Sequence, residues 1–353
     1  MFLQSQWVVS KKFDLAFFLF PFLMGVVYFL LIYFFPAFAL PITAVVWVVF
    51  AQAHFGSTWF IYFDKKNRQY YREHPIRYYV MPLVVAVAVL YLGYVNLTLL
   101  VVLISIASLY HVTKQSYGVL QLYRMKNGES SAGERQTEKM ALFGWSLFFG
   151  GYGAFHLPDF RQFILPVETL ARIGLWALFA VCAGLTILMV KQFIVRRQNS
   201  IQKNVFLVAS LLLYSPYLYA AVILVDIYQM EIATLTSLIA HYMQYIGIVW
   251  LVNRNKYQET TPYGAGSPIL KNISKRVPLI LAVILGYGLL MAAFRWGVPQ
   301  GNLALYKILP NVVLALVAVH FYLDAFIWKF SNPYYRETVL PFIKPPNHLT
   351  TRS

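Results

Sequence analysis

The chain has little cysteine and little charge. Cys182 is the only cysteine among 353 residues, and it lies inside an apolar run. Disulfide bonds and metal sites built from thiolates are therefore excluded, and a small buried thiol is the expected role of Cys182. Charged residues make up 12% of the chain, against about 25% in soluble proteins, whereas hydrophobic residues make up 59%. This composition indicates a polytopic membrane protein.

Several motifs of well-known enzyme classes are also missing. The chain contains no phosphate-binding GxxxxGK[ST] loop, no GxGxxG fingerprint and no GxSxG elbow. It also lacks the HExxH and HxxHH clusters, the latter being typical of membrane desaturases and hydroxylases. These absences disfavour ATP-driven transport and serine hydrolysis.

Apolar runs dominate what is present. Ten of them are long enough to cross a hydrocarbon core of about 30 Å as helices. They cover residues 13–35, 38–63, 79–96, 97–125, 140–155, 170–194, 205–227, 232–252, 277–296 and 303–330. We therefore predict an all-α transmembrane bundle of about ten spans, which forms one integral membrane domain over residues 1–353.

The basic residues of the chain gather in the loops between these runs. Lysine and arginine number 29 against 13 acidic residues, which gives a formal net charge of +16. Placing Lys11 and Lys12 in the cytoplasm puts every basic loop and both chain ends on that side, as the rule of cytoplasmic positive charge requires. We expect these charges to meet membrane lipids and not nucleic acid, in a plasma membrane such as the bacterial inner membrane.

Four of the predicted spans carry a histidine near the same depth. His54, His111, His241 and His320 each precede the charged end of their span by 9 to 13 residues. At a rise of about 1.5 Å per residue, each ring lies roughly 13–20 Å from the cytoplasmic edge. Ionisable groups inside membrane spans are costly and are functional by default. The four histidines are therefore candidates for one shared site.

A polar residue follows each histidine three or four positions later. These residues are Thr58, Gln115, Gln244 and Asp324, and their offsets place them on the same helical face as the histidine. Gln115, Gln244 and Asp324 suit the partner that fixes the orientation of a metal-bound imidazole. Two alternatives stay open: these side chains join helices by hydrogen bonds, or Asp324 is itself a ligand and one histidine drops out.

A site of neutral histidines without thiolates suits iron, copper or zinc. We favour non-haem iron, since histidine-rich iron sites leave positions open for dioxygen. Haem bound through pairs of these histidines is a second possibility. The alternative without any metal is that each histidine is a hydrogen-bonded packing residue.

Lys114 follows His111 by less than one helical turn. If it faces the histidines, its charge repels a cation, so it either extends away to the membrane surface or binds an anionic intermediate. We count Lys114, Gln115, Gln244 and Asp324 as the candidate catalytic residues.

The segment His54-Phe55-Gly56, together with intramembrane histidines on separate helices, resembles the bacterial Brp/Blh-type membrane carotene dioxygenases. The Lys114-Gln115 pair and the His320-x-x-x-Asp324 pair have no counterpart in that resemblance. The resemblance to these dioxygenases implies histidine-ligated iron and oxidative cleavage of a lipophilic substrate.

Three functions are consistent with these residues. The leading hypothesis is a metal-dependent membrane oxidoreductase of the oxygenase type, which acts on an apolar, lipid-like or isoprenoid small molecule with an electron donor that the sequence does not identify. The second is a haem-binding electron-transfer or haem-handling protein. The third is a transporter or proton-coupled channel that uses the histidines, Lys114 and Asp324 as a relay.

Overall fold

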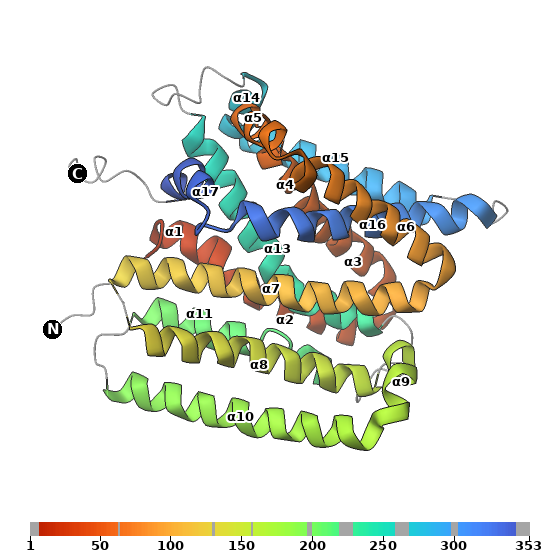
Figure 1. Ribbon diagram of the computed structural model, residues 1–353, viewed down its shortest axis with the longest axis vertical. Helices are drawn as coiled ribbons and strands as arrows, with labels where there is room; N and C mark the ends of the chain where they lie inside the picture. The colour runs from red at the N-terminus through yellow and green to blue at the C-terminus, as the bar shows by residue number, and fades with distance from the viewer. Residues whose placement is uncertain are drawn as a thin grey trace. The chain divides into compact units, whose positions relative to one another are not determined.

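The computed structural model describes residues 7–62, 64–128, 131–156, 158–195, 200–218, 229–257, 268–297 and 303–343 (Figure 1). Within these ranges the regular structure is entirely helical, without strands. Eight helical segments are long and apolar enough to cross a membrane: 11–34, 36–62, 76–95, 97–127, 161–194, 231–256, 277–296 and 308–327. The all-α class is thus confirmed for the described residues, and these eight helices have the length and apolar composition of membrane spans, while the number ten and the cytoplasmic termini stay predictions.

Two of the ten predicted spans are not among these eight. Residues 140–155 form the second half of α8 (Ala132–His156), a helix that begins with charged residues and carries glycine at four positions from Gly144 to Gly153. Residues 205–227 begin in α11 (Ile201–Leu211), which ends in a turn just before Pro216. Proline disfavours helical backbone in the residue before it, which accounts for this end. Residues 219–228 lie outside the described ranges.

The chain divides into two compact units. Unit 1 consists of Met1–Leu40 and Ser108–His241, and unit 2 consists of Pro41–Ala107 and Tyr242–Ser353. Two long helices, α7 (Leu97–Asn127) and α13 (Gln229–Lys256), contribute residues to both units. The single integral membrane domain of the sequence analysis stays a prediction.

Unit 1 is built around long helices that pack through small residues. Besides α8 and α11, its helices are α1 (Lys11–Asp14), η1 (Leu15–Leu19), α2 (Phe20–Phe34), η2 (Pro36–Phe38), α9 (Pro158–Ile164), η5 (Leu165–Val167) and α10 (Glu168–Val195). Helices α8 and α10 lie side by side and are joined through α9 at one end (Figure 1). A Cβ atom on Gly144 would lie 2.6 Å from Sγ of Cys182, so the buried thiol packs directly against this glycine. The prediction of a buried structural thiol is confirmed.

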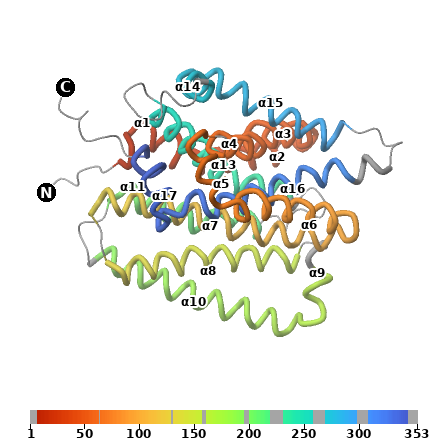
Figure 2. Tube along the Cα trace, turned by 45° about the horizontal axis from the view of Figure 1, so that its top comes forward, coloured from red at the N-terminus to blue at the C-terminus, as the bar shows by residue number. Residues whose placement is uncertain are grey.

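Unit 2 surrounds its histidines with short and long helices. They are α3 (Ala39–Val46), η3 (Trp47–Gln52), α4 (Ala53–Tyr62), α5 (Lys65–Glu73), η4 (Ile76–Val80), α6 (Met81–Val95), α14 (Pro268–Lys275), α15 (Val277–Trp296), α16 (Leu303–Ile327), α17 (Pro333–Thr338) and η6 (Leu340–Phe342). Helices α6 and α16 run side by side, as Figure 2 shows. The backbone of α15 approaches η3 so closely that a Cβ atom on Gly288 would lie 2.5 Å from the carbonyl oxygen of Val48. Small residues allow such close packing where lipid supplies no hydrophobic drive.

A polar cluster around Asp64 anchors the end of α4. Oδ1 of Asp64 accepts a hydrogen bond from the backbone N–H of Asn67 at 2.9 Å and caps α5. Its other oxygen lies 3.2 Å from Nζ of Lys256 and accepts a hydrogen bond from the Tyr257 hydroxyl. The cluster ties α4 and α5 to the last turn of α13.

A tyrosine cluster next to α5 extends this anchor. The rings of Tyr70 and Tyr334 stack with centroids 3.8 Å apart, and the Tyr335 hydroxyl donates to the Tyr78 hydroxyl at 2.8 Å. Burial raises the pKa of the Tyr71 and Tyr335 hydroxyls well above the usual tyrosine range, so both stay neutral. These rings are structural parts of unit 2.

Candidate metal centre

Two of the four histidines meet in unit 2. His54 lies on α4 directly after η3, a π-helical stretch of the kind that often marks a functional position. His320 lies on α16, and both rings are almost completely buried, with 0% and 1% exposure. Their Nε2 atoms are 2.9 Å apart. The two imidazoles are thus joined by a buried hydrogen bond between helices that are long and apolar enough to cross a membrane.

A chain of hydrogen bonds determines which nitrogen of His320 carries the proton. The Tyr245 hydroxyl donates to Oδ1 of Asp324 at 2.8 Å. Oγ1 of Thr58 lies 2.8 Å from the Tyr245 oxygen and 2.6 Å from Nδ1 of His320. Since the only proton of Tyr245 goes to Asp324, Thr58 donates to Tyr245, and Nδ1–H of His320 donates to Thr58. Nε2 of His320 is therefore unprotonated and accepts a hydrogen bond from Nε2–H of His54 at 2.9 Å.

Asp324 brings a carboxylate to the same place. Its Oδ2 lies 3.7 Å from Nε2 of His320, one helical turn away on α16, as the spacing predicted. While Oδ1 accepts from Tyr245, Oδ2 lies on the side of Nε2 of His320. Two histidine nitrogens and one carboxylate oxygen make a donor set that binds a divalent first-row metal.

Aromatic rings surround the two histidines. The ring of Tyr245 lies 4.4 Å from that of His54, and the ring of Phe55 lies 5.0 Å from that of His320, measured between centroids. The Tyr242 ring is 5.2 Å from His54. These rings cover the imidazoles with apolar surface and exclude bulk water from them.

The side chain of Gln244 is buried in unit 2, on α13. Both polar atoms of its side-chain amide are buried, and neither makes a hydrogen bond to the part of the chain that the structure describes. A role in orienting a ligand therefore stays a prediction for this residue. Leaving a buried amide unsatisfied costs about 1–3 kcal/mol.

The other two histidines meet in unit 1. The rings of His111 on α7 and His241 on α13 lie 5.1 Å apart at an interplanar angle of 85°. Gln115 was expected to orient an imidazole, but its Nε2 donates to the backbone carbonyl oxygen of His241 at 3.0 Å. Its amide thus joins α7 to the α13 backbone, because a side chain of this length one turn after His111 reaches the facing carbonyl.

Lys114 supports the outward alternative of the sequence analysis. The residue is exposed, and its Nζ lies 5.7 Å from the ring centre of Tyr110, which is itself 55% exposed. Cation–π contact of this kind stabilises an ammonium on an outer face. A catalytic role for Lys114 stays a prediction.

The sequence analysis overlooked Tyr245 and assigned no role to Thr58. A signal for both exists in the sequence, since Thr58, Tyr245 and Asp324 each follow a histidine by four positions. Gln244, at an offset of three, was predicted to orient an imidazole because an amide is a common hydrogen-bond partner of that ring. A strict four-residue offset finds all three members of the hydrogen-bond chain.

Comparisons with known proteins add no assignment. No family model matches this chain, and neither the curated proteins nor the solved structures contain a match. The resemblance to membrane carotene dioxygenases therefore stays a prediction, and the function has to be argued from the side chains.

Proposed function

We propose that the protein is an integral membrane non-haem iron oxygenase, whose iron ion is bound in unit 2 by His54, His320 and Asp324. The hydrogen-bond chain through Thr58 and Tyr245 is the observation that carries this proposal. A ligand must present an unprotonated nitrogen to the metal, and this chain puts the proton of His320 on Nδ1 and leaves Nε2 unprotonated.

The 2.9 Å between the two Nε2 atoms is the distance of a hydrogen bond between the rings. A bound metal ion would replace this hydrogen bond, and His54, His320 and Asp324 would hold it. Nitrogen and oxygen donors without a thiolate suit iron, with copper and zinc as the next choices among metals.

Two histidines and one carboxylate leave coordination positions open, a pattern associated with non-haem iron oxygenases. Bound iron would supply the activation of dioxygen. The residues of the chain would supply the rest: Thr58 fixes the His320 ring, and Tyr245 fixes Asp324 so that Oδ2 stays available.

The substrate proposed for this site is an apolar, lipid-like or isoprenoid molecule. His54 and His320 lie on helices that are apolar enough to span a membrane, and Phe55 and Tyr242 cover their rings. A water-soluble substrate would have to cross this apolar surface, while a lipid can enter from the bilayer. The plasma membrane is the proposed location.

His111 and His241 remain predicted ligands of the four-histidine arrangement. Their rings approach each other, and the Gln115 amide donates to the backbone carbonyl oxygen of His241. The proposed donor set of unit 2 contains the carboxylate of Asp324. This set follows the alternative of the sequence analysis in which Asp324 is itself a ligand and a histidine drops out.

Oxygen uptake by iron-loaded protein tests the proposed activity. Purified protein in lipid nanodiscs would be loaded with Fe²⁺ without oxygen, then given oxygen together with either a polyene isoprenoid or a saturated hydrocarbon. We expect uptake and an oxidised product, identified by mass spectrometry, only with iron and the polyene. The Asp324→Ala variant is the matched control and should show neither.

Two other outcomes would overturn the proposal. A strong Soret band in the purified protein would assign the histidines to haem. Proton or metal flux into proteoliposomes by protein that retains no stoichiometric iron would favour the transporter.

A further inference from the structure

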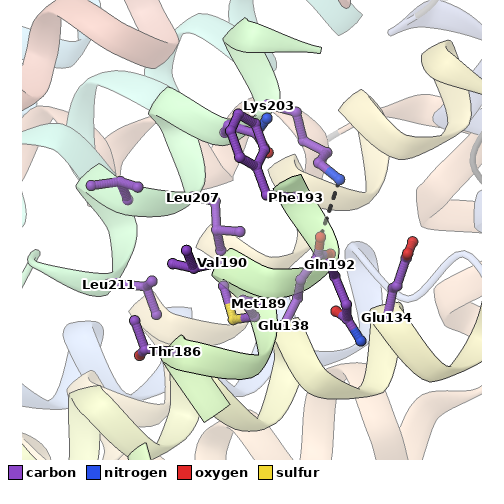
Figure 3. Close-up of a pocket in the computed structure, with 12 residues that line it drawn as sticks. Glu134, Glu138, Thr186, Met189, Val190, Gln192, Phe193, Lys203, Leu207 and Leu211 are labelled. Atoms are coloured by element: carbon purple, nitrogen blue, oxygen red, sulfur yellow. Dashed lines mark hydrogen bonds and ion pairs between the residues drawn. The ribbon is translucent and has the colours of Figure 1, made fainter. Parts of the chain in front are cut away.

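Unit 1 contains a cavity that is separate from its histidines. It has a volume of about 210 Å³ and lies between α8, α10 and α11 (Figure 3). One end is polar and is formed by Glu134, Glu138, Lys203 and Asn204, while the rest is formed mainly by apolar side chains of α10 and α11. The cavity is thus amphipathic along its length.

The charges at the polar end neutralise one another. Glu138 accepts a hydrogen bond from Arg124 at 2.6 Å and another from Lys203 at 3.1 Å, the latter drawn as a dashed line in Figure 3. Oε2 of Glu134 lies 3.8 Å from the same arginine. Two cations and two carboxylates leave no formal net charge, so neither an anionic nor a cationic head is favoured here.

Asn204 gives this end an additional donor. Its Nδ2 atom is buried and makes no hydrogen bond to any residue that the structure describes, although the side chain lines the cavity. Buried amide donors in proteins almost always have a partner. A hydroxyl or carbonyl oxygen in the cavity would supply the missing acceptor without adding charge.

The apolar part of the cavity extends along α11 and forms a groove that can hold a hydrocarbon chain. Leu207 and Leu211 follow the polar end along α11, and from Lys203 to Leu211 the helix rises roughly 12 Å. Val190 and Val208 are 52% and 55% exposed along the same groove, so it opens to the outer face of the helices. A hydrocarbon chain can therefore leave the cavity sideways into lipid.

We infer that this cavity binds an uncharged long-chain lipid with a hydroxyl or carbonyl group at one end, such as a diacylglycerol or a fatty alcohol. The oxygen of the head group accepts a hydrogen bond from Nδ2 of Asn204, and the chain lies against Leu207 and Leu211. The volume is below the range of roughly 300–1,000 Å³ of complete ligand sites. The cavity thus holds the head and the first carbons, while the remaining chain lies in the bilayer.

Photocrosslinking of the full-length protein in phosphatidylcholine nanodiscs tests this inference. The probe is a long-chain alcohol with a diazirine close to the hydroxyl, and the reference probe is a diazirine alkane of the same length. We expect the alcohol to label residues 186–193 or 203–211, and the alkane to label them much more weakly. Excess unlabelled diacylglycerol should compete, whereas phosphatidylglycerol should not.

Variants separate a specific site from general contact with lipid. Leu207→Trp fills the cavity and should reduce labelling at least about tenfold, as expected when the occupied volume is lost. Asn204→Leu removes one neutral hydrogen bond and should reduce labelling roughly fivefold. Val205→Trp, an exposed position on the same helix outside the cavity, should label like the wild type.

Three results would overturn the inference: equal labelling by alkane and alcohol, unchanged labelling of Leu207→Trp, or displacement of the probe by phosphatidylglycerol alone. The last result would assign the cavity to a charged lipid.

Discussion

The two histidine pairs of this protein differ in what supports them. In unit 2, His320 is fixed through its second nitrogen by Thr58, Tyr245 and Asp324 in sequence. In unit 1, His111 and His241 approach with their rings, and the nearby amide of Gln115 bonds to backbone. Metal-binding histidines are almost always held at the second nitrogen, and the hydrogen bond from Nδ1 of His320 to Thr58 supplies this support for His320.

Histidines at equal depth in a membrane are therefore not equivalent. All four lie at similar positions in their spans, yet only the unit 2 pair has a carboxylate one turn away that also contacts the supporting chain. The partners of an imidazole identify its role better than its depth does.

The largest effect is expected when a ligand of unit 2 is removed. His54→Ala or His320→Ala should lower the iron content at least about tenfold, because each removes one of three donors. His241→Ala should retain most of the iron, as measured by inductively coupled plasma mass spectrometry after identical loading. Equal losses in His111→Ala and His241→Ala would instead support the four-histidine arrangement.

The Asp324→Asn variant tests whether the carboxylate next to the unit 2 histidines binds iron. Asparagine can still accept the hydrogen bond from Tyr245, but it lacks the negative charge that binds iron. We expect iron affinity to fall about 10–100-fold in competition with a chelator. Gln244→Leu is the control and should leave the affinity unchanged, since its amide contacts no described partner. Wild-type affinity in Asp324→Asn would restrict Asp324 to a structural role.

Tyr245→Phe and Thr58→Val interrupt the chain without removing a ligand. Each should weaken iron binding by about tenfold, the lower end of the effect of residues that orient ligands. Tyr242→Phe keeps a ring next to His54 and should behave like the wild type. If all three variants bind iron equally, the hydrogen-bond chain does not orient His320.

The packing behind His54 is tested by two glycines on one helix. Gly288→Ala would place a methyl group 2.5 Å from the carbonyl oxygen of Val48, next to the segment that leads to His54. Gly286→Ala meets no atom within 4 Å. We expect Gly288→Ala to destabilise the protein by about 1–3 kcal/mol and Gly286→Ala to leave it unchanged or slightly stabilised. Equal melting temperatures would contradict the close contact.

The smallest effect is expected in unit 1 at Lys114. Its ammonium lies over the exposed ring of Tyr110, so Lys114→Ala should leave iron affinity and oxygen uptake unchanged. A clear rise in iron affinity would mean that the charge faces the metal.

The sequence predicted the helical class and the residues of the proposed site for a physical reason. Ionisable groups are rare in spans, so His54, His320 and Asp324 stand out from apolar neighbours, and the offset of four places the last two on one face. Tyr245 did not stand out, because tyrosines are numerous here and most of them pack.

The direction of Lys114 could not be predicted in the same way. Successive residues of a helix are rotated by about 100°, and polar residues occupy several sides of α7 around Lys114, among them Thr113, Gln115 and Ser116. Only the neighbouring helices decide which side faces inward. The end of α11 at Leu211 was not predicted either, because the apolar run 205–227 was taken as one span although Pro216 is a local signal.

X-ray absorption at the iron edge of the loaded wild-type protein tests the proposed iron site of unit 2 directly, because it counts the imidazole ligands around the metal. We expect two imidazoles together with oxygen ligands, which correspond to His54, His320 and Asp324. Four imidazoles without a carboxylate, or the scattering of a porphyrin, would contradict the proposed site.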